Sequence, residues 1–219
     1  QRILALDAEK IAPEKLPGWL GHPDQRVRMK GQFELARRNM SEALTEVLRN
    51  PEATRLARLH AIWGIGQISR RTPAVLKSLN PAWKSEDPEI VAQCAKIAGD
   101  VPGHLPGIAG LRKHLLTALS HKSLRVQFFA AISLGKHKVE EATPGLINLL
   151  ATAGSQDPYL RHAGMMGLKG ALSPGRLADL HDHESRTVRL SAIVALRNLH
   201  APEITAFLED KDELILLEA

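Results

Sequence analysis

The sequence has few residues of the kinds that build β-sheets, disulfides or membrane spans. Its 219 residues include one cysteine, eight aromatic residues and nine valines. A lone Cys94 excludes an internal disulfide, a cysteine-rich zinc site and a CxxCH haem attachment within this chain. The scarcity of β-branched and aromatic side chains argues against a β-sandwich or β-barrel. No apolar run approaches the roughly 20 residues that cross a bilayer, so we expect no membrane insertion.

Leucine and alanine are abundant instead, with 33 and 28 copies. Both residue types lose little conformational freedom in a helix, so this composition predicts an all-α fold. Hydrophobic residues make up 44% of the chain and charged residues 24%. These fractions are typical of a folded chain and argue against disorder.

Internal repeats cover almost the whole sequence. Similar segments recur, among them DQRVRMKGQFELA from Asp24, DPEIVAQCAKIAG from Asp87 and DPYLRHAGMMGLKG from Asp157. The apolar residue that anchors each segment recurs every 26 to 36 residues: Val27, Ala57, Ile90, Val126, Leu160, Val188 and Leu214. Irregular spacing near 30 residues is typical of helical pairs joined by variable loops.

Each repeated segment is predicted to be the second helix of such a pair. Asp24, Asp87 and Asp157 are predicted N-caps, because a carboxylate there accepts from free N–H groups of the first turn. A small residue follows each anchor after four positions and, in most repeats, a larger aliphatic one after eight, which places all three on one helix face. The first helices are expected around 44–48, 75–79, 111–119, 146–150, 177–180 and 204–208.

The segments DPYLRHAGMMGL and SLRVQFFAAISLG, from Asp157 and Ser123, resemble the second helix of the HEAT-like (PBS-lyase-type) repeat. The resemblance implies a right-handed α-solenoid of about six and a half helical pairs. It covers residues 14–219, with the last repeat truncated, and leaves 1–13 as a lead-in from a preceding domain. HEAT-like arrays serve as scaffolds, as carriers and occasionally as enzymes, so the fold alone does not assign an activity.

A narrower resemblance rests on LGHPDQRVRMKGQFELARR from Leu20 and RLARLHAIWGIGQI from Arg55. These phrases are similar to the HEAT-repeat segment of large bacterial membrane-bound dehydrogenase or haem-binding proteins. The resemblance implies the middle domain of a redox-type protein and an exported, periplasmic location; without it the chain would be cytoplasmic. This chain contains neither a propeller nor CxxCH, so no redox residue or cofactor is carried over.

An apolar column is expected on the second helices, opposite the buried stripe and on the concave surface that second helices usually line in such an array. Positions two and six after the anchors lie there, since successive residues turn by 100°. The candidate protein-interaction residues are Met29, Phe33, Leu59, Trp63, Phe128, Ile132, Met166 and Val194. One interpretation makes this column a docking surface for a protein partner or another domain of the same polypeptide. The other makes it ordinary core, covered by neighbouring helices and loops.

The excess of positive charge lies in the first third of the chain. Residues 1–71 hold 13 Lys and Arg against 8 Asp and Glu, whereas 72–219 hold 16 of each. Arg26, Arg28, Arg37, Arg38 and Arg58 are candidate contacts for phosphates or an acidic partner. Alternatively, arginines at the repeat's usual position (Arg28, Arg58, Arg161 and Arg189) bind neighbouring loops and helix ends.

Candidate catalytic and metal sites are sparse. His181, Asp182 and His183 have metal-ligand side chains, but two histidines at i, i+2 without a third ligand at a suitable spacing are a weak signal, so no metal site is expected. His60, His114 and His137 are expected at helix surfaces or C-terminal caps, and Cys94 as an inert buried thiol. The prediction is therefore a non-catalytic scaffold without a cofactor. The alternative is a nucleic-acid-binding protein or DNA glycosylase-like enzyme using the basic first repeats, for which only Trp63 with Glu34 offers a possible site.

Overall fold

The computed structural model describes residues 7–101 and 110–219, and all regular secondary structure in these ranges is helical. The all-helical class predicted from composition is thereby confirmed. The chain divides into two compact units, Gln1–Leu111 (unit 1) and Arg112–Ala219 (unit 2), which are considered separately. Across the described ranges, no helix is both long and apolar enough to span a bilayer.

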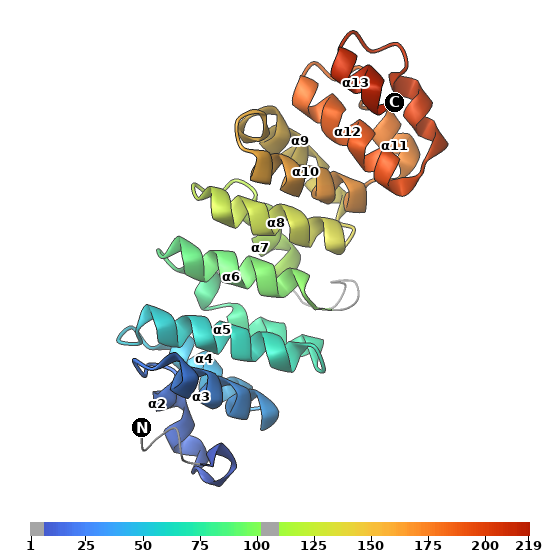
Figure 1. Ribbon diagram of the computed structural model, residues 1–219. Helices are drawn as coiled ribbons and strands as arrows, with labels where there is room; N and C mark the ends of the chain where they lie inside the picture. Colours follow the sequence, from blue (N-terminus) through green and yellow to red (C-terminus); the bar gives the residue numbers. More distant parts are fainter. Residues whose placement is uncertain (1–6, 102–109) are drawn as a thin grey trace. The chain divides into compact units, whose positions relative to one another are not determined.

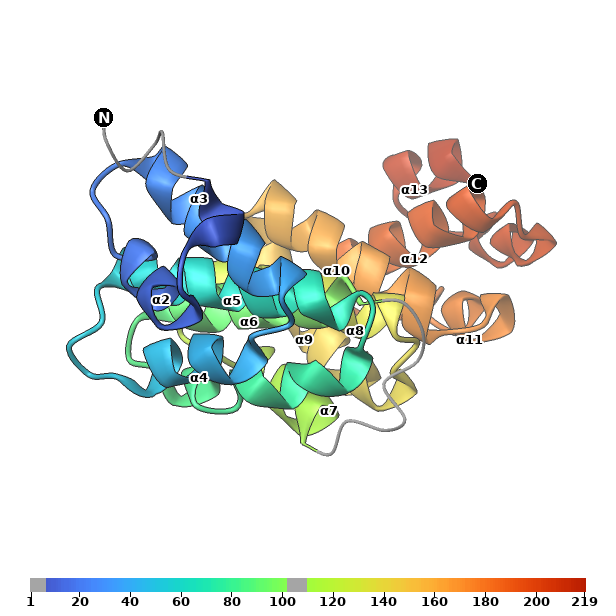
Figure 2. The same cartoon turned by 90° about the horizontal axis from the view of Figure 1, so that it is seen from below.

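Unit 1 places its long helices α3, α5 and α6 side by side in chain order (Figure 1). Helix α4 packs against α3 and α5 from a second layer, seen below them in Figure 2. The elements are η1 (Ala8–Lys10), η2 (Pro13–Lys15), α2 (Leu16–Trp19), α3 (Gln25–Arg37), α4 (Ser41–Arg49), α5 (Arg55–Ser69), η3 (Pro73–Leu79), η4 (Ala82–Lys84) and α6 (Pro88–Gly99).

Unit 2 repeats this arrangement with α8, α10 and α12 as its long helices, and α9 and α11 pack against them. Its elements are α7 (Leu111–Ala118, which begins at the unit boundary), α8 (Leu124–Lys136), η5 (Glu140–Ala142), α9 (Thr143–Ala151), η6 (Ala153–Ser155), α10 (Pro158–Ala171), α11 (Pro174–Ala178), α12 (Arg186–Leu199), η7 (Pro202–Phe207) and α13 (Glu213–Glu218).

The predicted stripe forms the core of both units. In each of the six long helices, the anchor and the residues four and eight positions later are buried. Asp24, Asp87 and Asp157 cap α3, α6 and α10 by accepting from main-chain N–H groups of the first turn. Stripe and caps are therefore confirmed, since both follow from local periodicity and from the free N–H groups of a helix start.

Two features differ from the expectation. The predicted first helices at 75–79 and 204–208 are 3₁₀ helices, η3 and η7, each beginning at a proline. The last anchor is Ile215, which is buried, whereas Leu214 is exposed. Asp212 is the N-cap of α13, so the anchor lies three residues after the cap, as Leu160 follows Asp157. Most of the segment between α6 and α7 lies outside the described residues.

Helices α8 and α10 approach each other through glycines. A Cβ atom built on Gly170 would lie 2.1 Å from the carbonyl oxygen of Gly135, and one on Gly135 would lie 2.6 Å from that of Met166. Both contacts involve main-chain atoms, which cannot rotate away as a side chain does. The two backbones therefore pack at a distance that only glycine permits at these positions.

Candidate protein-interaction surface

Helix α3 presents an apolar strip with a basic row beside it. Met29 and Phe33 are 37% and 48% exposed, and as an i, i+4 pair they lie on the same face. Arg26, Lys30 and Arg37 lie beside this strip, within about 100° of Met29 around the helix axis. Two of these three, Arg26 and Arg37, are exposed, and Lys30 is half-buried. The rest of the circumference is mostly buried against α2, α4 and α5. This open arc of α3 is called the α3 face below.

The prediction for Leu59 on α5 is wrong, because this side chain is only 8% exposed. Its helix packs against α3 on one side and α6 on the other, which covers a position that helix rotation alone places outward. Trp63 is half-buried, and its indole Nε1–H donates to Gln93 Oε1 of α6 at 2.9 Å. The Trp63 ring also meets the His60 imidazole edge to face, with centroids 4.9 Å apart.

In unit 2 the remaining column residues are partly exposed. Phe128, Ile132 and Val194 are half-buried, and Met166 is 36% exposed. Phe128 also lines a groove of about 340 Å³ between the beginnings of α8 and α10. The other groove residues include Leu124 and Tyr159, two exposed side chains that the column prediction missed. They lie in the first turns of their helices, before the anchor residues from which the column positions are counted.

The arginine of the repeat binds main-chain carbonyls of the loop before its own helix. Arg28 donates to the carbonyls of His22 at 2.7 Å and Pro23 at 2.8 Å. The equivalent contacts are Arg58 to Asn50 and Pro51, Arg161 to Gly154, and Arg189 to His183 and Glu184. Gln127, at the same position of α8, donates to the carbonyl of His121 at 2.6 Å. The interpretation of these arginines as loop-binding residues is confirmed, and Arg28, which is 8% exposed, is too buried to contact a phosphate.

The other three candidate arginines form ion pairs. Arg26 binds Asp24 through two nitrogens, and Arg37 and Arg38 both bind Glu34. Arg38 also donates to main-chain carbonyls of the lead-in, including that of Ile11 at 3.0 Å. Hydrogen bonds from Arg37, assisted by Arg38, lower the pKa of Glu34 to about 2 although burial opposes this shift. Glu34 is therefore ionised at neutral pH and committed to these arginines rather than to Trp63.

A buried polar cluster joins α3 to α5. His60 was expected at a helix surface but is 3% exposed, because its partners come from the neighbouring repeat. Its Nδ1 lies 2.7 Å from Gln32 Oε1, and its Nε2 accepts from Arg28 Nε at 3.1 Å. These contacts require the neutral tautomer with the proton on Nδ1. Burial, followed by the positive charge of Arg28, lowers the pKa of His60 to about 4.

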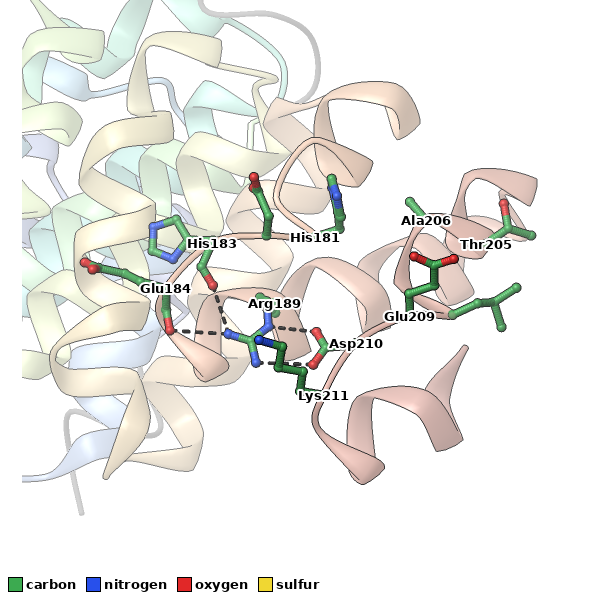
Figure 3. A pocket seen from close by; sticks show the side chains of 11 residues that line it. His181, His183, Glu184, Arg189, Thr205, Ala206, Glu209, Asp210 and Lys211 are labelled. Carbon is green, nitrogen blue, oxygen red and sulfur yellow. Dashed lines mark hydrogen bonds and ion pairs between the residues drawn. The ribbon is translucent and has the colours of Figure 1, made fainter.

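A polar pocket in unit 2 encloses about 710 Å³ between the loop before α12 and the loop before α13. Figure 3 shows Arg189 between the loop carbonyls and the carboxylate of Asp210, which its Nε contacts at 2.7 Å. Burial of Asp210 opposes ionisation, but hydrogen bonds from Arg189 and the Asp212 N–H outweigh it and lower the pKa of Asp210. His181 and Asp182 are exposed at the rim. Among the described residues, no three His, Cys, Asp or Glu side chains are grouped so as to hold a metal ion.

Two further side chains follow the sequence interpretation. Cys94 is fully buried in α6, and burial raises the pKa of its thiol well above the usual range. His137 is the C-cap residue of α8. Neither residue lines any of the pockets described above, so neither is part of the candidate surface.

Comparison with known proteins places the fold but not the function. No family model matches the chain, and no curated protein matches it. Among solved structures, YibA of Escherichia coli is similar with a TM-score of 0.56 and 16% identity, over 92% of this chain and 76% of YibA. An engineered protein is similar with a TM-score of 0.50 and 17% identity, over 94% of this chain and 92% of the other. At these identities the likeness concerns the fold alone.

Proposed function

We propose that this chain is a non-catalytic scaffold that binds a protein partner, or another domain of its own polypeptide, through the exposed faces of its second helices. The observation that carries the proposal is the α3 face, where Phe33 and Met29 are exposed side by side. Exposed apolar clusters with aromatic members are typical of protein-binding sites. The contacts of His60 on α5 with Gln32 and Arg28 on α3 join the two helices below this surface, which fixes its geometry before binding.

The architecture proposed for this scaffold is a right-handed solenoid of HEAT-like helical pairs. The support comes from the stripe that six successive second helices share and from a fold likeness extending over most of the chain. The proposal that the chain is the middle domain of a larger bacterial redox-type protein rests on the sequence phrases from Leu20 and Arg55.

Site-specific photo-crosslinking in the cells that make the protein tests this function. A photoreactive side chain at Met29 is expected to crosslink to another polypeptide or to a distant segment of the same one. The same group at Glu46, exposed on α4, is expected to give no such product. Products of equal yield at both positions, or none at Met29, would contradict the proposal.

The Phe33→Ala variant separates binding from folding. Because the ring is already about half exposed, its loss is expected to lower the free energy of unfolding by about 1 kcal/mol. Crosslinking through position 29 is expected to fall roughly tenfold, as for a central interface aromatic. Leu208→Ala, which removes a comparably exposed apolar side chain just after η7, is the control and should leave crosslinking unchanged. An unchanged yield in Phe33→Ala would show that this ring does not bind the partner.

A further inference from the structure

We infer that the partner of the α3 face is an acidic amphipathic helix that lies along α3; this inference rests on the proposed binding function. Its apolar side chains would pack on Met29 and Phe33, and its carboxylates would face Arg26, Lys30 and Arg37.

The shape of the α3 face suits a helix. Met29 and Phe33 form an i, i+4 ridge on a helix of 13 residues. Such ridges pack into the grooves between the side-chain rows of another helix. Arg26 and Arg37 are 11 positions apart, which corresponds to about 16 Å along the helix axis. A partner helix of about three turns would cover the ridge and the basic row together.

The charge around this ridge is positive. From Asp24 to Arg38 the chain carries five basic residues and two acidic ones. Both acidic side chains are engaged on α3 itself, Asp24 at the N-cap and with Arg26, Glu34 with Arg37 and Arg38. Glu9 of η1 also lies near Arg37, with its Oε1 3.9 Å from Arg37 Nε. The side chains of Arg26 and Arg37 nevertheless stay 72% and 56% exposed. They therefore still have N–H groups and surface free to meet carboxylates of a partner.

Helix α4, which packs against α3 from the second layer of unit 1, has the reverse charge. Helix α4 carries Glu42 and Glu46 against Arg49, and all three are exposed. An acidic helix approaching unit 1 is therefore attracted to α3 and repelled from α4, which favours one orientation of encounter. A basic helix would experience the opposite preference.

The surface is also fixed before binding. The Gln32 amide, which lies on α3 next to Phe33, binds His60 of α5, and Arg28 binds the other nitrogen of the same ring. These contacts hold α3 against α5, so little ordering of the α3 face is needed when a partner binds. Preorganisation of this kind favours affinity, because less conformational entropy is lost on association.

Peptide binding to the full chain tests the inference. The probe is a labelled amphipathic peptide of about 14 residues, long enough to follow α3, with leucines on one face and glutamates beside them. A second peptide replaces every glutamate by lysine, and a third scrambles the order of the first. The glutamate peptide is expected to bind at least about tenfold more tightly than either control in fluorescence anisotropy, and less tightly at high salt.

Variants locate the bound peptide. Phe33→Glu and Arg37→Glu are expected to weaken the glutamate peptide by about tenfold or more, whereas Arg49→Glu on α4 leaves its affinity unchanged. Equal binding of the glutamate and lysine peptides would overturn the inference. So would binding of phosphatidylglycerol vesicles or duplex DNA, but not of the glutamate peptide, because the α3 face would then serve a lipid surface or a nucleic acid.

The two proposals fail in distinguishable ways. If position 29 crosslinks to a polypeptide in cells but the glutamate peptide does not bind, the scaffold function stands and the acidic helix is wrong. If position 29 gives no crosslink, the scaffold function fails whatever the peptide does.

Discussion

Replacing Gly170 by alanine is expected to destabilise the protein by about 3 kcal/mol, the upper end of the usual range for overpacking. The added methyl group would lie 2.1 Å from the carbonyl oxygen of Gly135, so α8 and α10 must separate. Alanine favours a helix over glycine by about 1 kcal/mol, which is too little to offset the lost packing. The measurement is the midpoint of urea unfolding, followed by far-ultraviolet circular dichroism.

Gly175→Ala in α11 is the matched control for this substitution. Nothing lies within 4 Å of the position that its Cβ would occupy. The same chemical change is therefore expected to leave the midpoint unchanged or to raise it slightly, since the helix gains propensity and meets no clash. Equal midpoints for Gly170→Ala and Gly175→Ala would show that α8 and α10 do not approach as closely as described.

Lowering the pH from 7.5 to 5 is expected to reduce the free energy of unfolding by about 2 kcal/mol through His60 alone. The pKa of His60 is lowered to about 4 in the folded protein, against about 6.5 in an unfolded chain. Between these values the unfolded state binds the proton and the folded state does not, so stability rises with pH. The contribution of His60 to the free energy of unfolding is lost as the pH falls from about 6.5 towards 4.

The comparison of wild type with His60→Gln measures this contribution. Glutamine keeps an oxygen that can accept from Arg28 but cannot be protonated, so the variant is expected to lose most of the stability difference between the two pH values. His162→Gln, which removes an exposed imidazole from α10, is the control and should keep the wild-type difference. Urea unfolding at both pH values is the measurement, and an unchanged difference in His60→Gln would contradict the assignment.

The sequence predicts the stripe and caps well because both depend on residues close together in the chain. Val27, Gly31 and Leu35 are one helix turn apart, and Asp24 caps the helix that begins beside it. Burial that depends on other repeats is harder to predict. Leu59 has the outward rotation of Met29, but α5 packs against α3 and α6, and Leu59 is covered. The angular position of a residue around its own helix does not show which other helices pack there.

His60 shows the same limit for polar residues. Its partners Gln32 and Arg28 are 28 and 32 positions away, so no local pattern predicts a buried imidazole. The last repeat shows a different ambiguity, because Asp210 and Asp212 both resemble N-caps. Arg189 of the preceding helix binds Asp210, which leaves Asp212 to cap α13. Only the contact between repeats decides between the two residues.

The arginine contacts with loop carbonyls bear on how this protein can change in evolution. The hydrogen bonds to these loops do not depend on the side chains of the loop, because every residue has a main-chain carbonyl. The donors are Arg28, Arg58, Arg161 and Arg189. Substitutions in these loops therefore keep the arginine–carbonyl hydrogen bonds while changing the exposed side chains. The loop sequences can therefore vary without changes in the core, whereas the loss of one arginine removes its hydrogen bonds to the loop.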